Sequence, residues 1–291
     1  MSGADPDLGD LTARTVLITG ANSGIGKATA AILAARGADV TITSRNRERG
    51  ESAATDIRRE AGGRGSVTVG DLDLARLSSV RSFAEKFRAD HPKLDVLILN
   101  AGLTSARRDV TEDGFEMMFQ VNHLGHFLLT HLLLDRVVAA EPSRIVVVAS
   151  VAHKGGPIDF DDLQSERNYG AMRTYGRSKL ANVLFARELA RRLDGTGVTV
   201  NAMHPGTVRT GWGGDGDGGF FLTWGIRMAR WAFLSPRQAG LRVAYLAAGR
   251  DVEGRTGGYY VRNRLTDPAP VGRDAAAARR LWEASKQLLG L

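Results

Sequence analysis

Cysteine is absent from the whole chain of 291 residues. Its absence excludes disulfides, thiolate catalysis and metal sites with sulfur ligands. Also missing are an apolar run long enough to span a bilayer, a long block of like charges and a recognisable nucleic-acid module. We therefore expect no transmembrane segment and no nucleic-acid partner. The formal net charge of +7 instead indicates a mild attraction for anionic ligands, such as phosphorylated cofactors or anionic lipid.

The first ten residues lack the basic and apolar pattern of a secretory signal. Residues 1–10 are acidic and polar, and we expect them to form a short disordered tail. The rest of the chain, residues 11–291, contains no linker, low-complexity tract or repeat. Its 43% hydrophobic content is that of one ordinary globular domain, for which the cytoplasm is the expected location.

Short apolar runs alternate with helical patterns along this domain. The expected strands are Thr15–Thr19, Asp39–Thr43, Ser66–Val69, Val96–Asn100, Arg144–Ser150, Thr199–Met203 and Gly258–Val261. The expected helices are Ile25–Arg36, Arg47–Ala61, Leu77–Ala89, Phe115–Ala140, Met172–Leu193, Pro236–Ala248 and Asp274–Gly290. Several strands are almost entirely apolar, which is typical of a sheet with helices on both faces. The alternation predicts one α/β domain with a doubly wound parallel sheet of about seven strands.

A glycine-rich turn follows the first expected strand and opens the first expected helix. Glycine permits a tight turn and close approach of a ligand, and the free amides of a helix N-terminus favour a pyrophosphate. Glycine in such a turn can also serve steric needs alone, but its place in the first βα unit favours a dinucleotide cofactor. The residues expected to bind it are Gly20, Asn22, Ser23, Gly24, Ile25 and Gly26.

The end of the second strand carries no acid, which bears on the choice between the two nicotinamide cofactors. An NAD site usually places Asp or Glu there to hold the ribose hydroxyls. This chain has Arg45 instead, whose guanidinium can pair with the 2′-phosphate of NADP(H). The alternative is that Arg45 merely begins a solvated run, residues 45–49. The missing acid favours NADP(H).

Three further strand ends fit a dinucleotide crevice. The acid after the third strand can accept from an adenine amino group, or cap the next helix. Small residues after the fourth strand let the backbone approach a ribose, or form an ordinary turn. The residues after the sixth strand free backbone groups for the nicotinamide carboxamide, or form a plain loop. The positions are Asp71, Leu72, Asn100, Ala101, Gly102, Pro205, Gly206 and Val208.

A tyrosine and a lysine four residues apart, Tyr175 and Lys179, are expected on one face of a helix. Ser150 closes the fifth expected strand and so lies at the carboxyl edge of the sheet. Such a set suits carbonyl reduction. Ser150 would hydrogen-bond the substrate oxygen, and Tyr175 would donate a proton to it, or take one during oxidation. Alternatively, Ser150 is a helix or turn cap and Lys179 a solvated helix residue.

Lys179 is expected to lower the pKa of Tyr175 and to position the nicotinamide ribose. An ammonium about 5 Å from a phenolate contributes roughly 3 kcal/mol at an effective dielectric near 20, or about two pKa units. Such a shift moves a tyrosine of pKa about 10 most of the way to physiological pH.

Asn122 lies in the middle of an expected helix, where asparagine is a poor helix former. We interpret it as a residue that redirects a backbone group toward a water beside Lys179. His123 and His126 have a spacing that suggests a metal site. No acid or cysteine accompanies them in this segment, so we interpret both as packing residues and expect no metal.

These motifs together resemble the short-chain dehydrogenase/reductase superfamily over nearly the whole chain, from about Leu11 to Val261. Finer details are similar to its retinol dehydrogenase-like branch. The strings that carry this similarity are NHLGHFLLT (122–130), IDFDDLQ (158–164), YGRSKLAN (175–182) and HPGTVRT (204–210). The resemblance implies a Rossmann fold with strand order 3-2-1-4-5-6-7, NADP(H) as cofactor, and a catalytic tetrad of Asn122, Ser150, Tyr175 and Lys179. It implies no specificity for retinol.

The most apolar stretch outside the expected sheet core is Phe220–Leu234. On a helix its polar residues would form one narrow stripe, so we expect a lid for a lipophilic substrate at residues 211–235, with the glycines of 211–219 as its hinge. A homo-oligomer interface or peripheral docking on a membrane would explain the same composition. The expected pocket residues are His153, Trp212 and Trp224, although His153 is alternatively a solvated loop residue.

These features predict an NADP(H)-dependent oxidoreductase that interconverts an alcohol and an aldehyde or ketone in a small, lipophilic molecule. The alternative function is a non-enzymatic NADP(H)-binding regulator or scaffold on the same fold. The intact tetrad favours the enzyme.

Overall fold

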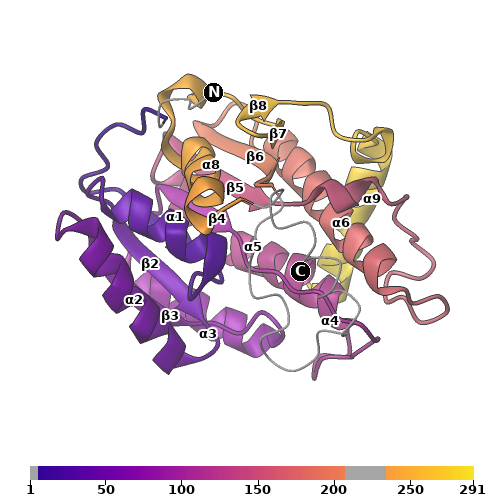
Figure 1. The fold of residues 1–291 in the computed structure, drawn as a ribbon. Coiled ribbons are helices and arrows are strands. Elements are labelled where there is room, and N and C mark those ends of the chain that lie inside the picture. Colours follow the sequence, from indigo (N-terminus) through magenta and orange to yellow (C-terminus); the bar gives the residue numbers. More distant parts are fainter. Residues whose placement is uncertain (1–5, 207–233) are drawn as a thin grey trace.

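In residues 6–206 and 234–291, the part of the chain that the computed structural model describes, eight strands form one sheet in the order β3-β2-β1-β4-β5-β6-β7-β8 (Figure 1). The strands are β1 (Thr15–Ile18), β2 (Asp39–Ser44), β3 (Ser66–Asp71), β4 (Val96–Leu99), β5 (Ser143–Val148), β6 (Val198–His204), β7 (Tyr259–Val261) and β8 (Arg264–Leu265). The predicted order of parallel strands is confirmed for β1 to β7. The short β8, which pairs antiparallel with β7, was not predicted.

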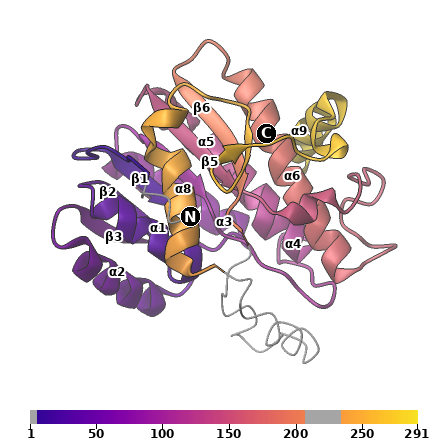
Figure 2. The same ribbon diagram turned by 45° about the horizontal axis from the view of Figure 1, so that its top comes forward.

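Helices connect successive strands, as the alternating pattern predicts. They are α1 (Gly24–Ala34), α2 (Arg47–Ala61), α3 (Leu77–Asp90), α4 (Met117–Phe119), α5 (Gly125–Val138), α6 (Ala171–Arg192), α8 (Pro236–Ala248) and α9 (Ala275–Leu289). Shorter turns are the π-helical η1 (Gln120–Leu124) and the 3₁₀ turns η2 (Val151–Lys154), η3 (Arg250–Val252) and η4 (Pro270–Gly272). Figures 1 and 2 show α8 beside α1, and α9 next to α6 at the far side of the molecule.

Helices cover both faces of the sheet, and this explains why its central strands are apolar throughout. All four residues of β4 are buried. Leu97 and Leu99 belong to the core under α3, α5 and α6, whereas Val96 and Ile98 belong to the core under α1, α2 and α8. Burial of each such side chain contributes about 1.5–3 kcal/mol. The two cores together fix the carboxyl edge of the strands, where the functional side chains gather.

The C-terminal helix α9 forms as its amphipathic pattern predicts. The Asp274 carboxylate accepts hydrogen bonds from the first free amides of α9, at 2.9 Å each. Leu281 is buried against the core, and the Trp282 ring stacks on Phe185 with 5.9 Å between the ring centres. The outer side of α6 is therefore covered by the chain's own C-terminus.

The segment before β1 is packed on the domain, at least from Asp7 onward. Leu8 is 2% exposed and belongs to the core under α1 and α8, and Asp7 O accepts a hydrogen bond from Arg250 N at 3.3 Å. The predicted disordered tail over residues 1–10 is therefore too long. Its apolar Leu8, in an otherwise polar segment, finds a place in the core. Residues 1–5 lie outside the described part of the chain.

Candidate active site

Tyr175 and Lys179 lie one turn apart on α6 and are almost fully buried, at 7% and 4% exposure. The Lys179 Nζ lies 5.8 Å from the centre of the Tyr175 ring and donates a hydrogen bond to Val148 O, at the end of β5, at 3.2 Å. Ser150, two residues further along, hydrogen-bonds the Tyr175 phenol. The predicted pair and the predicted serine are thus in one place.

Ser150 also caps a turn, which is the structural alternative considered for it. Its Oγ accepts a hydrogen bond from Ala152 N at 3.2 Å and begins η2. The next element, α6, packs closely against this turn, because a Cβ at Gly176 would lie 2.7 Å from Ala152 O. The glycine after Tyr175 therefore lets α6 approach β5 closely enough for the phenol to reach Ser150. The Ser150 side chain therefore both caps the turn and contacts Tyr175.

Asn122 fixes the loop that follows β4. Its Oδ1 accepts from Leu103 N at 2.8 Å, and its Nδ2 donates to Leu103 O at 3.0 Å and to Ser178 Oγ at 2.9 Å. A Cβ at Gly102 would lie 3.0 Å from Lys179 Nζ and 3.2 Å from Asn122 Oδ1. Because Gly102 has no side chain, the Lys179 amine and the Asn122 amide can both lie close to it.

The predicted helix 115–140 is interrupted at Asn122, which corrects the sequence-based expectation of one continuous helix. Gly125 N bonds Gln120 O, five residues back, and α4, η1 and α5 replace the single helix. The redirected backbone group is Asn122 O, which accepts a hydrogen bond from the His126 Nδ1 ring atom at 3.1 Å. The partner of this carbonyl is a histidine of the same chain, and the expected water beside Lys179 stays a prediction.

His126 links Asn122 to the glycine-rich turn. Its Nε2 lies 2.8 Å from Thr19 Oγ1, and this hydroxyl accepts hydrogen bonds from the backbone amides of Asn100 and Ala101 at 2.9 and 3.0 Å. Burial lowers the pKa of His126 to about 3, and the Lys179 ammonium adds to this effect. The ring is therefore neutral at physiological pH. Its Nδ1 donates to Asn122 O, and its Nε2 accepts from Thr19.

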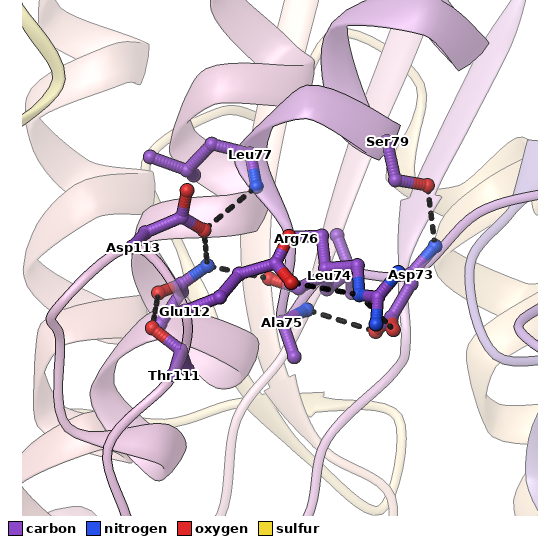
Figure 3. Close-up of polar contacts among 10 residues, drawn as sticks. Asp73, Leu74, Ala75, Arg76, Leu77, Ser79, Thr111, Glu112 and Asp113 are labelled. Atoms are coloured by element: carbon purple, nitrogen blue, oxygen red, sulfur yellow. Dashed lines mark hydrogen bonds and ion pairs between the residues drawn. The ribbon is translucent and has the colours of Figure 1, made fainter.

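Polar contacts join the loop before α4, at Thr111 and Asp113, to the start of α3 at Leu77, and Gln120 of the π-helical turn takes part in them (Figure 3). Gln120 Nε2 donates to Asp113 Oδ2 at 2.7 Å, and the Gln120 Oε1 accepts from the Thr111 hydroxyl. Asp113 Oδ2 also accepts from Leu77 N at 2.9 Å, at the start of α3. Gln120 is fully buried. The first residue of η1 is thus tied to the loops before α3 and α4, which holds Asn122 in its register.

The pKa of Tyr175 shifts in the direction opposite to the prediction. Burial raises the pKa of its phenol, and the hydrogen bond from Ser150 lowers it by less. Lys179 is buried as well, and burial lowers the pKa of its amine to about 8. The prediction included only the attraction between the ammonium and the phenolate. Burial also removes water from both groups, which disfavours the charged form of each. At neutral pH the phenol keeps its proton and is a hydrogen-bond donor.

The glycine-rich turn packs more closely on the residues that follow β4 than side chains would allow. A Cβ at Gly20, whose φ is +64°, would lie 2.8 Å from Ala101 Cβ, and one at Gly26 would lie 2.6 Å from Asn100 Nδ2. No side chain caps the N-terminus of α1 at Ser23, and its first turn carries no acid. Unoccupied amides at a helix N-terminus favour an anion. Asn22, Ser23, Gly24 and Ile25 lie at or near this surface.

Arg45 lies exposed just after β2, in front of the α2 cap Asn46. Asp71, at the end of β3, does not cap α3: its carboxylate pairs with Arg47 at 2.9 Å, while Leu77 N is bound by Asp113. Leu72 is buried, and its amide donates to Ser44 O at 3.2 Å. The ends of β2 and β3 are therefore held together beside Arg45.

Asn100 connects the end of β4 to the glycine-rich turn. It therefore does more than form an ordinary turn, which was the structural alternative for this position. Its Nδ2 donates to Thr19 O at 2.8 Å and to Gly20 O at 3.1 Å. After β6, Pro205 O accepts from Arg242 Nη1 at 2.9 Å, and Gly206 adopts a φ of +104°. Val208, Trp212, Trp224 and the expected lid at 211–235, up to residue 233, lie outside the described residues.

His153 is not a solvated loop residue, and its expected place in the substrate pocket stays a prediction. Its side chain is fully buried. Its Nδ1 donates to Ser150 O at 2.7 Å, and its Nε2 accepts from Ala269 N at 3.1 Å. Both ring nitrogens are thus occupied in holding the Ser150 turn against the C-terminal segment.

Sequence reasoning assigned packing roles to the two histidines of the π-helical region and missed the link that His126 makes. His123 does pack, with its Nε2 2.9 Å from Ser285 Oγ. For His126 a signal existed: it lies four residues after Asn122, so its ring can reach the Asn122 carbonyl along the helix. Thr19, at the end of β1, carried no such signal because its partners come from β4 and α5.

The fold and the site together define a dinucleotide-dependent dehydrogenase of the doubly wound class. Residues 14–215 match the family model described as short chain dehydrogenase, and the chain belongs to this family. The protein is therefore an oxidoreductase. The retinol dehydrogenase-like branch predicted from the sequence is also confirmed. The chain is 47% identical to Retinol dehydrogenase 14 of Homo sapiens over 302 residues, which cover 99% of this chain and 89% of that protein.

Two solved structures extend the comparison. A putative uncharacterized protein from Mycobacterium Paratuberculosis has a TM-score of 0.77 and 36% identity, and the match covers 98% of this chain and 96% of that one. The Pseudomonas aeruginosa RhlG/NADP active-site complex has a TM-score of 0.66 and 25% identity, covering 86% and 94% of the two chains. Within the described residues, no helix has the length and apolar character to cross a membrane.

Proposed function

We propose that this protein is an NADP(H)-dependent oxidoreductase that interconverts an alcohol and an aldehyde or ketone, with Tyr175 as the acid and base. The observation that carries the proposal is the buried group of Ser150, Tyr175 and Lys179 at the carboxyl edge of β5. Burial of a lysine and a tyrosine together is unfavourable for folding. Groups buried at such a cost are typical of functional sites.

In this proposal each side chain has one task. Ser150 holds the substrate oxygen by a hydrogen bond. Tyr175, protonated at neutral pH because burial raises its pKa, donates its proton to that oxygen as the carbonyl is reduced. Lys179 positions the nicotinamide ribose, and its positive charge stabilises the phenolate that remains. General acid catalysis of this kind contributes about 10²–10⁴-fold to the rate.

The residues around the glycine-rich turn fit NADP(H), which supplies the hydride when it is bound. Gly20 and Gly26 let the turn pack closely on Ala101 and Asn100, and the uncapped N-terminus of α1 offers a pyrophosphate free amides. Arg45 stands where an NAD site usually has an acid, and it would pair with the 2′-phosphate. The similarity to a solved RhlG/NADP complex supports the same choice.

The substrate is proposed to be lipophilic. The apolar stretch 220–234 and the similarity to Retinol dehydrogenase 14 support this class, which includes retinoids. Neither observation selects one compound within it.

A steady-state screen tests the proposal. Consumption of NADPH and of NADH is followed at the same enzyme concentration with retinal, aliphatic aldehydes, steroid ketones and quinones. We expect turnover with at least one lipophilic carbonyl and a higher kcat/KM with NADPH. Tight NADPH binding without turnover of any substrate, in either direction, would contradict the enzyme and favour the regulatory or scaffold alternative.

A further inference from the structure

A cavity of about 480 Å³ opens beside the turn that Ser150 begins. It lies between η2 and the hairpin of β7 and β8, at the carboxyl edge of the sheet. One wall is Val151, the residue that follows Ser150 in the chain. The lining residues are Val151, Lys154, Tyr259, Val261, Arg262, Arg264, Thr266 and Asp267. Neither the tetrad nor the expected cofactor contacts contribute a side chain to it.

Three of the lining side chains are cations, Lys154, Arg262 and Arg264. None of them forms an ion pair with a carboxylate of residues 6–206 or 234–291. The acid in the lining, Asp267, is 85% exposed and lies 3.6 Å from Arg273. The cavity therefore carries an excess of positive charge that its own walls do not neutralise.

The charge of this cavity reaches neighbouring groups. His204, at the end of β6, has its pKa lowered to about 4, first by burial and then by a set of cations that includes Arg262 and Lys154. Burial lowers the pKa of Arg242 too, and Arg262 adds to that shift. The cations of the cavity thus act on His204 and Arg242 as well. An anion in the cavity would offset their charge.

Tyr259 supplies an independent indication of a ligand. It lines the cavity and is 2% exposed, and its buried hydroxyl has no hydrogen-bond partner among the described residues. A buried hydroxyl without a partner is unfavourable by about 1–3 kcal/mol. Burial raises the pKa of this phenol, so it remains a donor at neutral pH. The hydroxyl atom itself is covered, so an acceptor in the cavity would reach it after a small movement of the wall.

His153 connects the wall of the cavity to Ser150, the proposed catalytic serine. The Tyr259 ring lies edge-on to His153, with 4.9 Å between the ring centres, and His153 Nδ1 holds Ser150 O at 2.7 Å. On the other side, Arg262 and Asn263 form the tight turn of the β7–β8 hairpin, with φ of 53° and 63°. Arginine is an unusual choice for a left-handed position, and the turn directs this residue to the cavity.

We infer that the cavity binds an anionic group, a carboxylate or a phosphate, carried by the substrate itself at some distance from its carbonyl. The preferred substrates are then amphipathic carbonyl compounds with a lipophilic body and an acidic end. The guanidinium groups of Arg262 and Arg264 pair with the anion, and the Tyr259 hydroxyl donates a hydrogen bond to it. This inference rests on the proposed oxidoreductase function and specifies its substrate class.

A matched pair of aldehydes tests the inference. Nonanal and 9-oxononanoate have the same chain length and differ in a terminal carboxylate. For the wild-type protein we expect kcat/KM to be about tenfold or more higher for the carboxylate, through a lower KM, because one charge-assisted contact is sufficient for such a ratio. The ratio should fall toward one in the double variant Arg262→Gln/Arg264→Gln, and should fall severalfold in Tyr259→Phe.

Two controls separate the sources of such an effect. Arg279→Gln removes one positive charge, against two in the double variant, from an exposed position on α9 and should leave the ratio as in the wild type. Inorganic phosphate should compete with 9-oxononanoate but not with nonanal if free anions enter the same cavity. Equal kcat/KM for both aldehydes in the wild type, or a ratio unchanged in the double variant, would overturn the inference while leaving the proposed function intact. Turnover of no carbonyl compound would overturn both.

Discussion

The cofactor edge and the catalytic corner of this sheet are built on opposite principles. At the cofactor edge, Gly20 and Gly26 matter because they lack side chains, since an added Cβ would lie within 3 Å of Ala101 or Asn100. At the catalytic corner, Tyr175 and Lys179 matter because their side chains are buried, which shifts both pKa values. In the first region, added side-chain atoms would clash. In the second region, polar groups are buried although their burial is unfavourable for folding.

This contrast makes opposite predictions for stability. A larger residue at the cofactor edge should weaken both folding and binding. An apolar residue at the catalytic corner should remove activity while relieving a cost of folding, a trade-off common at active sites. The predictions below follow this contrast from the largest expected effect to the smallest.

Lys179→Met should lower kcat/KM by about 10²-fold or more, since the charge that stabilises the phenolate is lost. It should also change the pH dependence of stability. In the wild type the folded pKa of Lys179 is lowered to about 8 from 10.5, so between these values the unfolded chain holds the extra proton and stability rises with pH. Relative to the variant, the wild type should gain roughly 3 kcal/mol of unfolding free energy from pH 7.5 to 10.5. Parallel denaturant curves at both pH values measure this, and a constant difference would contradict it.

Gly20→Ala should destabilise the protein by about 2–4 kcal/mol and weaken NADPH binding, because the new Cβ meets Ala101 as well as a left-handed φ. Gly62→Ala is a matched control: its φ is also +64°, but no heavy atom lies within 4 Å of the added Cβ. It should cost about 1–2 kcal/mol and leave cofactor affinity unchanged. Equal losses in the two variants, measured by urea unfolding and NADPH titration, would argue against tight packing at Gly20.

Arg45→Asp should weaken NADPH binding by about 10–100-fold more than NADH binding, because a charge-assisted contact to the 2′-phosphate becomes a repulsion. Arg64→Asp makes the same charge change at an exposed position in the turn between α2 and β3, at the opposite edge of the sheet. It should affect the two cofactors equally. If Arg45→Asp also affected them equally, another residue would have to read the phosphate.

His126→Leu should destabilise the protein by about 1–2 kcal/mol, because Asn122 O and the Thr19 hydroxyl lose their buried partner. His131→Leu, at an exposed position on α5, should change stability little. Because burial lowers the folded pKa of His126 from 6.5 to about 3, only the unfolded wild-type chain takes up a proton between these values, so the advantage of the wild type should shrink by roughly 2 kcal/mol from pH 8 to pH 5. A difference that stayed the same at pH 5 and pH 8 would mean that the ring titrates alike in the folded and the unfolded protein.

The same contrast explains which features could be predicted from the sequence. The glycine-rich turn, the strand order and the meeting of Ser150 with Tyr175 follow from local patterns and from a sheet that brings carboxyl ends together. Helix and strand bounds agree within a few residues for the same reason. The two-residue β8 was missed because its residues are exposed and carry no alternating pattern.

Features that depend on burial could not be predicted. The direction of the Tyr175 pKa, the enclosure of His153 and the position of Leu8 each depend on how much water the folded chain removes. No single segment of sequence encodes that quantity. The π-helical turn at Asn122 likewise depends on Gln120, whose partner Asp113 lies before α4 and joins it to the start of α3. The cytoplasmic location and any homo-oligomer or membrane contact remain predictions from sequence.

The central claim is that the Tyr175 phenol donates the proton that completes reduction. Tyr175→Phe tests it most directly, with kcat/KM for an aldehyde and the NADPH dissociation constant measured on the same preparations, and with Tyr169→Phe as a control for loss of a half-buried phenol. We predict a loss of at least about 10²-fold in kcat/KM for Tyr175→Phe, with NADPH affinity within about threefold of the wild type. Wild-type turnover in that variant would contradict the account.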